Sequence, residues 1–425
     1  MSNVLTDDTK AIILLCGTLG KDSLPKPLAQ AEYISLVRWL ISQELRPSSL
    51  LSEENIHEAA TGSGLDVTRL TALLARGVQL GFAVEEWQSK GIWIVSRSDS
   101  EYPARYKKHL GEKAPPLLFG VGPKGLLNGG GLAIVGSRNV DIEGEDFTRS
   151  VAGLCADNRM PVVSGGARGV DQIAMTAALA EGGIAIGVIA ENLLKKSLER
   201  DYRNAISGQR LLLISPYHPN ARFTVWAAMA RNKLIYAMAD YGLVVSAEHQ
   251  KGGTWTGAKE ELRREKPIPV FVRSTGKIPA GNKKLLDIGA IKWPSDVSKA
   301  NLKEQLEKAV PKISRPTKPE NMSIFDIKAK PTTSGETRRS GNKDLVVREN
   351  AQDYEVSQIP TGELIYHAVM PIIIAELSSP ITPDELSKRL NVSKSQLNAW
   401  LNQAVEDKKI YKLSRPVRFC TTKDS

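Results

Sequence analysis

The chain has 425 residues, 41% of them hydrophobic and 24% charged, a composition typical of a folded protein with more than one domain. Its three cysteines, Cys16, Cys155 and Cys420, lie far apart without zinc-ligand spacing, and no apolar run reaches the roughly 18 residues of a membrane-spanning helix, so disulfides, a metal site and a membrane span are not expected. The formal net charge of +10 favours a polyanionic partner, and the acidic start, MSNVLTDDTK, is unlike a secretory signal and predicts a cytoplasmic protein.

Residues 1–88 are predicted to form a small helical domain. Apolar residues recur at helical spacing through most of this segment, with Ile34, Val37 and Ile41 expected on one face, and Asp66 is placed to cap the helix that follows it. No residue here indicates catalysis, so we expect a structural role or contact with another protein.

Residues 89–310 alternate between short apolar runs and helix-compatible stretches. Two β-like runs come first, and they are followed by LAIVG, PVVSG, IAIGVIA, RLLLIS, YGLVVS and PIPVFV. Strands that are apolar on both faces and alternate with helices are typical of a parallel sheet covered by helices. The segment is therefore predicted to be an α/β domain with a Rossmann-like, doubly wound parallel sheet.

Three of these strands end in small or basic residues. Ligands of such sheets bind outside the carboxyl ends of the strands, where glycine lets a phosphate approach the backbone, hydroxyls donate hydrogen bonds and arginine offers a planar fork. The residues concerned are Gly136, Ser137 and Arg138; Ser164, Gly165, Gly166, Ala167 and Arg168; and Gly252, Gly253 and Thr254. Together they predict a site for a phosphate ester.

Arg231, Asn232 and Lys233 come shortly before another strand. Two cations flanking an amide suit a phosphodiester backbone, although the same residues could equally form the polar start of a buried helix. The sequence has neither a GxxxxGK[ST] loop nor a GxGxxG loop in the right place after a strand, which disfavours nucleoside triphosphate hydrolysis and hydride transfer, so no cofactor is expected.

Residues 311–355 are rich in Pro, Ser, Thr, Lys and Arg and are predicted to be a flexible basic linker. Residues 356–425 are predicted to form a winged helix, in which Thr382 and Glu385 make a capping box at the start of one helix and a hairpin follows the next. The second helix carries only Lys394 at its N-terminal end, so contact with a protein and contact with DNA both remain open.

Several of these segments match a known family. The stretches SDSEYPARYKKHL, AIVGSRN, VVSGGARGVDQIAMTAAL, ARNKLIYAMADYGLVVSAEHQKGGTWTGA and GNKKLLDIGA, within roughly residues 98–294, resemble the DprA/Smf family of DNA-processing proteins. The resemblance implies a domain that binds single-stranded DNA without sequence preference, forms a homodimer, loads a RecA-type recombinase in natural transformation or recombination, and catalyses no reaction. It assigns the DNA groove to Arg138, the SGGARG loop and Arg231 to Lys233, with Gly252, Gly253 and Thr254 in place of a Ser-Gly-Ser loop.

The chain also departs from the family pattern. Met175 stands where the family usually has histidine, Ser215 is followed by proline instead of glutamate, and the usual Arg-Asn-Arg is Arg-Asn-Lys. These departures indicate a divergent branch.

Two other functions fit the same architecture. GGTWTGAKEE resembles a loop of nucleotide phosphoribohydrolases of the cytokinin-activating type, in which Glu260 or Glu261 would support glycosidic cleavage, although Trp255 and the displaced Gly257 depart from it. The long linker instead favours a nucleotide sensor whose signal the winged helix transmits. Trp226, Tyr236 and Trp255 are open to interpretation as core residues or as platforms for stacked bases.

Overall fold

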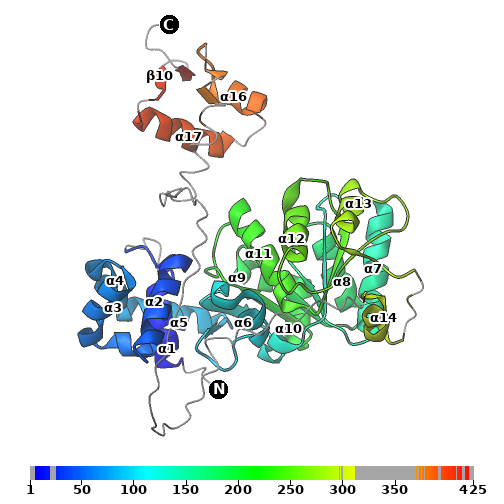
Figure 1. Ribbon diagram of the computed structural model, residues 1–425, viewed down its shortest axis with the longest axis horizontal. Helices are drawn as coiled ribbons and strands as arrows, with labels where there is room; N and C mark the ends of the chain where they lie inside the picture. The colour runs from blue at the N-terminus through cyan, green and yellow to red at the C-terminus, as the bar shows by residue number, and fades with distance from the viewer. Residues whose placement is uncertain are drawn as a thin grey trace, which may run out of the picture. The chain divides into compact units, whose positions relative to one another are not determined.

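The computed structural model describes residues 5–19, 25–295, 297, 300–311, 370, 373–374, 376–377, 379–390, 394–407, 409–413 and 417–420. The chain divides into two compact units, residues 1–319 and 320–425, which are considered separately (Figure 1). Apart from residue 311, the predicted linker lies outside the described residues, as do residues 356–369.

A nine-stranded sheet forms the centre of the first unit. Its strands are β1 (Trp93–Ser96), β2 (Leu117–Val121), β3 (Leu132–Gly136), β4 (Val162–Ser164), β5 (Ala185–Val188), β6 (Leu211–Ser215), β7 (Tyr241–Ser246), β8 (Val270–Val272) and β9 (Ile291–Lys292). They lie in the order β1-β2-β6-β5-β4-β3-β7-β8-β9, with β3 to β9 mutually parallel.

The prediction of a parallel sheet is confirmed for β3 to β9 and is wrong for β2. Strand β2 is antiparallel to both β1 and β6. The segment between β1 and β2 returns the chain beside β1 in the opposite direction, whereas every connection from β3 onward brings the next strand in parallel.

Helices cover both faces of the sheet (Figure 1). They are α6 (Ala104–Leu110), α7 (Ile142–Asp157), α8 (Val170–Ala180), α9 (Leu193–Ser197), α10 (Arg200–Ser207), α11 (Val225–Met238), α12 (Gly252–Leu262), α13 (Ala280–Asp287) and α14 (Leu302–Ala309). Successive side chains of a strand point to opposite faces. In β3, Ala133 and Val135 accordingly join the core beneath α11 and α12, and Leu132 and Ile134 join the core beneath α7 and α8.

The N-terminal segment forms α1 (Asp7–Cys16), α2 (Gln30–Ser42), α3 (Ile56–Ser63), α4 (Val67–Leu74) and α5 (Gly77–Ser89). Their apolar residues belong to the same core cluster as Phe119 of β2 and Leu211 of β6. The boundary placed between residues 88 and 89 therefore lies inside one compact unit. The predicted cap is confirmed, because the Asp66 carboxylate accepts a hydrogen bond from the backbone N–H of Arg69 at 2.7 Å.

The face of α2 that carries Ile34, Val37 and Ile41 is only partly buried, with Val37 packed against the core. Tyr33, Leu36 and Leu40 are buried, whereas Ile41 is 39% exposed. Two adjacent apolar stripes with the same helical spacing run along this helix, and spacing alone does not distinguish them. The tertiary packing of α2 selects the stripe that begins at Tyr33.

The second unit contains α16 (Pro383–Leu390), α17 (Lys394–Glu406) and an antiparallel pair, β10 (Tyr411–Leu413) and β11 (Arg418–Cys420). The capping box is confirmed: the Glu385 N–H donates to Thr382 Oγ1 and the Thr382 N–H donates to Glu385 Oε2, each at 3.3 Å. Two helices followed by a hairpin agree with the predicted order of elements, and the assignment as a winged helix stays a prediction.

Within the described part of the chain, no helix combines the length and the apolar character that crossing a membrane requires.

His218 lies where the helical segment meets the sheet. Its ring packs edge-to-face against Trp87 of α5, with ring centroids 5.7 Å apart, and its Nδ1 accepts a hydrogen bond from the backbone N–H of Asn220 at 3.1 Å. Burial lowers the pKa of His218 below its usual 6.5, an effect that Glu86 opposes and Lys90 reinforces. His218 is therefore held in its neutral form.

Because the folded state lowers the pKa of His218, it binds fewer protons than the unfolded state at mildly acidic pH. The contribution of His218 to the free energy of unfolding is therefore complete at a pH above the pKa of histidine in the unfolded chain. It is lost as the pH falls below that pKa. We expect the Tm, measured by circular dichroism, to fall between about pH 7 and about pH 5, and to fall less in His218→Gln. An equal fall in both proteins would contradict this assignment.

Candidate functional site

The site lies where the order of the strands reverses. Strand β3 has β4 on one side and β7 on the other, so successive crossovers leave it in opposite directions. At such a point the loops from neighbouring strands separate and leave a crevice at their carboxyl ends. The predicted residues at the ends of β3, β4 and β7 meet around this crevice.

Two cavities, of about 500 and 690 Å³, occupy the crevice. Arg138, Ala167, Phe223 and Arg231 line both of them, so the two cavities form one continuous depression. The smaller cavity lies over the loop after β4 and the end of β5, and the larger lies over the end of β3 and the start of α12.

A buried ion pair forms the floor of the crevice. Arg231 of α11 is 5% exposed, and its Nη1 lies 3.5 Å from Oδ2 of the buried Asp171 of α8. The Nε and Nη1 of Arg231 have no hydrogen-bond partner among the described residues. Both atoms are buried, and Nη1 faces the Asp171 carboxylate, so Arg231 contributes positive charge to the two cavities that it lines.

Burial shifts the pKa of both members of this pair. Burial raises the pKa of Asp171, against the opposing effects of Arg231 and of backbone hydrogen bonds at Gly136 and Ala167. Burial likewise lowers the pKa of Arg231, and Asp171 opposes that shift. The pair is therefore mutually stabilising, and one carboxylate connects the end of β3, the loop after β4, and α11.

Two of the predicted glycines serve the protein's own packing. A Cβ on Gly165 would lie 1.1 Å from Arg231 Nη1 and 2.6 Å from Asp171 Oδ2, and a Cβ on Gly136 would lie 2.5 Å from a side chain of α8. Both glycines also line the cavities, Gly165 the smaller and Gly136 the larger, so their role beside a phosphate stays a prediction. Gly252, with φ 72°, has open space instead.

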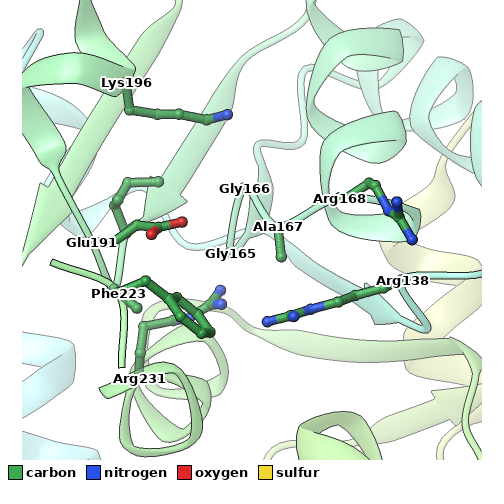
Figure 2. A pocket seen from close by; sticks show the side chains of 11 residues that line it. Arg138, Gly165, Gly166, Ala167, Arg168, Glu191, Lys196, Phe223 and Arg231 are labelled. Carbon is green, nitrogen blue, oxygen red and sulfur yellow. The ribbon is translucent and has the colours of Figure 1, made fainter. Parts of the chain in front are cut away.

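Three further cations border the smaller cavity: Arg138, Arg168 and Lys196. Figure 2 shows Arg138 and Lys196 pointing into the cavity from opposite sides of the Gly165–Ala167 loop, while Arg168 extends away from its centre. The Arg138 guanidinium lies 5.3 Å from the ring centroid of Phe223, within the range of a cation–π interaction. The Nη2 of Arg168 donates to Asn139 Oδ1 at 2.6 Å.

Some of the other predicted residues form hydrogen bonds between the elements around the larger cavity, and others lie outside both cavities. The Nδ2 of Asn232 donates to the Gly253 carbonyl at 2.9 Å, and the Thr254 hydroxyl donates to the Gly136 carbonyl at 3.0 Å, which joins α11, α12 and β3 around the larger cavity. Ser137 also lines that cavity.

Ser164 and Lys233 line neither cavity. The buried Ser164 hydroxyl donates to the Ile134 carbonyl at 2.6 Å and so joins β4 to β3. Lys233 follows Arg231 by two positions on α11, and this spacing turns it away from the face that Arg231 presents to the crevice.

Sequence reasoning missed Glu191, Lys196 and Phe223, all of which line the smaller cavity. Glu191 lies in the loop after β5, Lys196 in α9 and Phe223 in the loop after β6, and no glycine-rich strand end marked these segments as a site. The sequence did not predict that these residues lie near the end of β4, because only the order of strands in the sheet brings them together.

The structure does not support a glycosidic role for Glu260 or Glu261, since neither lines a cavity. Glu261 is 1% exposed, and its carboxylate pairs with His109 Nε2 at 2.9 Å and accepts the Ile268 N–H at 2.9 Å. It therefore joins α12 to α6 and to the start of β8.

The three aromatic candidates also differ in their surroundings. Tyr236 and Trp255 are buried at 1% and 7% exposure, whereas Trp226 at the start of α11 is 70% exposed. Tyr236 and Trp255 belong to the core, although Tyr236 also lines the larger cavity, and Trp226 is exposed beside the ring of Tyr217.

We expect Gly165→Ala to displace the Arg231 guanidinium and to lower the free energy of unfolding by about 1–3 kcal/mol, since the added methyl group overpacks a buried site. Urea unfolding measures the change. Gly153→Ala is the matched control, because a Cβ there meets no heavy atom within 4 Å, and a gain of up to about 1 kcal/mol is expected from helix propensity. Equal stability of the two variants would contradict the packing argument.

Comparison with known proteins supports the fold. The model of the family described as DNA recombination-mediator protein A matches residues 93–300. The DNA processing protein DprA of Streptococcus pneumoniae is 34% identical over 165 residues, which cover 37% of this chain and 56% of that protein. Protein Smf of Escherichia coli is 29% identical over 245 residues, which cover 54% of this chain and 66% of that protein.

A solved structure shows the same fold. The DNA processing protein A of Streptococcus pneumoniae aligns with a TM-score of 0.53 at 22% identity, over 67% of this chain and 94% of that one. The segment that the family model matches contains all nine strands of the large sheet and every residue that lines the two cavities. The chain therefore resembles the DNA recombination-mediator protein A family over residues 93–300 and spans about half to two thirds of the length of the relatives that it matches.

Proposed function

We propose that the chain binds single-stranded DNA along the two joined cavities, with the phosphates on the cationic side chains. The observation that carries this proposal is Arg231, whose buried guanidinium lines both cavities where they meet. Arg138, Arg168 and Lys196 add positive charge to the same crevice. Charged donors of this kind form the strongest hydrogen bonds with phosphate oxygens.

The larger cavity offers further contacts to a phosphate. Its lining includes Gly252, Gly253 and Thr254, the first residues of α12, and backbone N–H groups at a helix start favour an anion. The proposed groove comprises residues 136–138, 165–168, 231–232 and 252–254. It leaves out Ser164 and Lys233.

Exposed apolar side chains favour a single strand over a duplex. Phe223, Val225, Trp226 and Met229, at and before the start of α11, are between 41% and 70% exposed, and all but Trp226 line a cavity. Unpaired bases stack on such side chains, whereas the faces of bases in a duplex are already covered by their neighbours.

The remaining parts of the proposal concern the whole protein. We infer that a homodimer in the cytoplasm loads a RecA-type recombinase onto the bound strand, in transformation or recombination, without catalysing a reaction. The description of the family as a recombination mediator and the names of the relatives as DNA processing proteins support this role. Residues 356–425 are proposed to act as a winged helix that contacts protein or DNA.

Binding of a small nucleotide is the second candidate function. The smaller cavity, at about 500 Å³, has the volume typical of small-molecule sites. A nucleotide that raises the Tm while oligonucleotides bind weakly would favour this function over DNA binding.

We expect the Arg138→Ala/Lys196→Ala double variant to bind a single-stranded oligonucleotide about 10- to 100-fold more weakly than wild type, because two charged contacts to phosphates are lost. The slope of log K against log salt should become shallower by about 0.7 for each lost phosphate contact. Fluorescence anisotropy at several salt concentrations, with single-stranded and duplex oligonucleotides, measures both quantities.

Arg149→Ala/Arg203→Ala is the charge-matched control, since both arginines are exposed, on α7 and α10, and neither lines a cavity. It should keep both the affinity and the preference for a single strand. A wild-type affinity that does not change with salt, or equal losses in the double variant and the control, would contradict the proposed groove.

A further inference from the structure

Glu191 places a carboxylate inside the cationic cavity. The residue follows the end of β5, lines the smaller cavity and is exposed, and Figure 2 shows its side chain pointing toward the middle of the cavity. The four cations of that cavity are Arg138, Arg168, Lys196 and Arg231, yet among the described residues the Glu191 carboxylate forms no hydrogen bond and no ion pair with any of them.

The backbone around Glu191 is fixed. The N–H of the next residue, Asn192, donates to the Ala221 carbonyl at 2.7 Å, and Asn192 Oδ1 accepts the N–H of Lys195 at 2.9 Å as the cap of α9. Glu191 is thus held at the cavity wall by its neighbours and not by a partner of its own side chain.

A carboxylate at this position disfavours a phosphate beside it and accepts hydrogen bonds only. A ligand must therefore present N–H or O–H groups to Glu191. Within a DNA strand the phosphates and the deoxyribose carry no such donors, which leaves the edges of the bases.

The rest of the cavity wall suits a base. The largely buried Ile189 and Ala190, which precede Glu191, also line this cavity, and Figure 2 shows the ring of Phe223 below Glu191 in the view. An unstacked base fits between apolar and aromatic surfaces and is identified by hydrogen bonds to its edge.

We propose that the smaller cavity takes up one base of the bound strand and that Glu191 selects guanine there. Guanine presents two adjacent donors, N1–H and the 2-amino group, which match the two oxygens of a carboxylate. Thymine presents a single N–H between two carbonyl oxygens, which a carboxylate repels. Glu191 therefore adds a base preference to binding that the phosphates provide for any sequence.

This inference rests on the proposed binding of single-stranded DNA and alters one expectation, that the chain binds without sequence preference. The energy of the phosphate contacts is the same for every sequence. The preference at Glu191 is added to it and is confined to one position of the strand.

The test compares the affinities of full-length protein for (dG-dT)6, (dI-dT)6 and dT12 in a lithium buffer, which keeps guanine-rich strands unfolded. Hypoxanthine, the base of dI, keeps the N1–H but lacks the 2-amino group. We expect wild type to bind (dG-dT)6 about tenfold more tightly than dT12, with (dI-dT)6 between them.

Glu191→Gln, which removes the charge and keeps the size, should bind all three strands with equal affinity and dT12 at least as tightly as wild type does. Glu181→Gln, at an exposed position that lines neither cavity, should keep the wild-type preference.

Three outcomes would overturn the inference. Equal affinity of wild type for the three strands would overturn the base preference and leave DNA binding intact. A preference for guanine that persists in Glu191→Gln would assign it to another group. Failure of wild type to bind any strand would overturn the inference together with the proposed function.

Discussion

The buried pair of Asp171 and Arg231 is the interaction on which the site depends. Its carboxylate is also hydrogen-bonded to the backbone at Gly136 and Ala167, so one side chain connects the end of β3, the loop after β4, and α11. Breaking a buried pair leaves an uncompensated charge and costs several kcal/mol, about 3–5. The loops around the crevice are thus ordered by the charge beneath it before any ligand binds.

This arrangement explains why Arg231 differs from the other cations. Arg138 and Arg168 are exposed, and water screens their charge. Arg231 is buried, so a bound anion would interact with it in a medium of lower dielectric constant, where the attraction is stronger. Gly165 makes the geometry possible, because any side chain there would occupy the volume of the guanidinium.

The crevice combines two kinds of chemistry. Cations and helix starts along its length suit phosphates, which every strand presents, whereas Glu191 and the apolar wall beside it suit the edge and the face of a base. The apolar residues of the N-terminal helices share a core with β2 and β6. The loop after β6 supplies Phe223, so these helices pack against a strand that leads into the site. The helical segment therefore contributes to the shape of the site without lining it.

The sequence by itself determined the first eight strands of the sheet, the caps at Asp66 and Thr382, and the placing of glycine and basic residues such as Arg138 at strand ends. These features follow from local spacing and residue type, which the chain carries at each position. Only the tertiary structure decided the antiparallel direction of β2, the buried stripe of α2, the burial of Arg231 and the position of Glu191 in the cavity. Each of these four features depends on which distant segments of the chain become neighbours. The order of strands in the sheet and the packing of side chains in a shared core decide which segments those are.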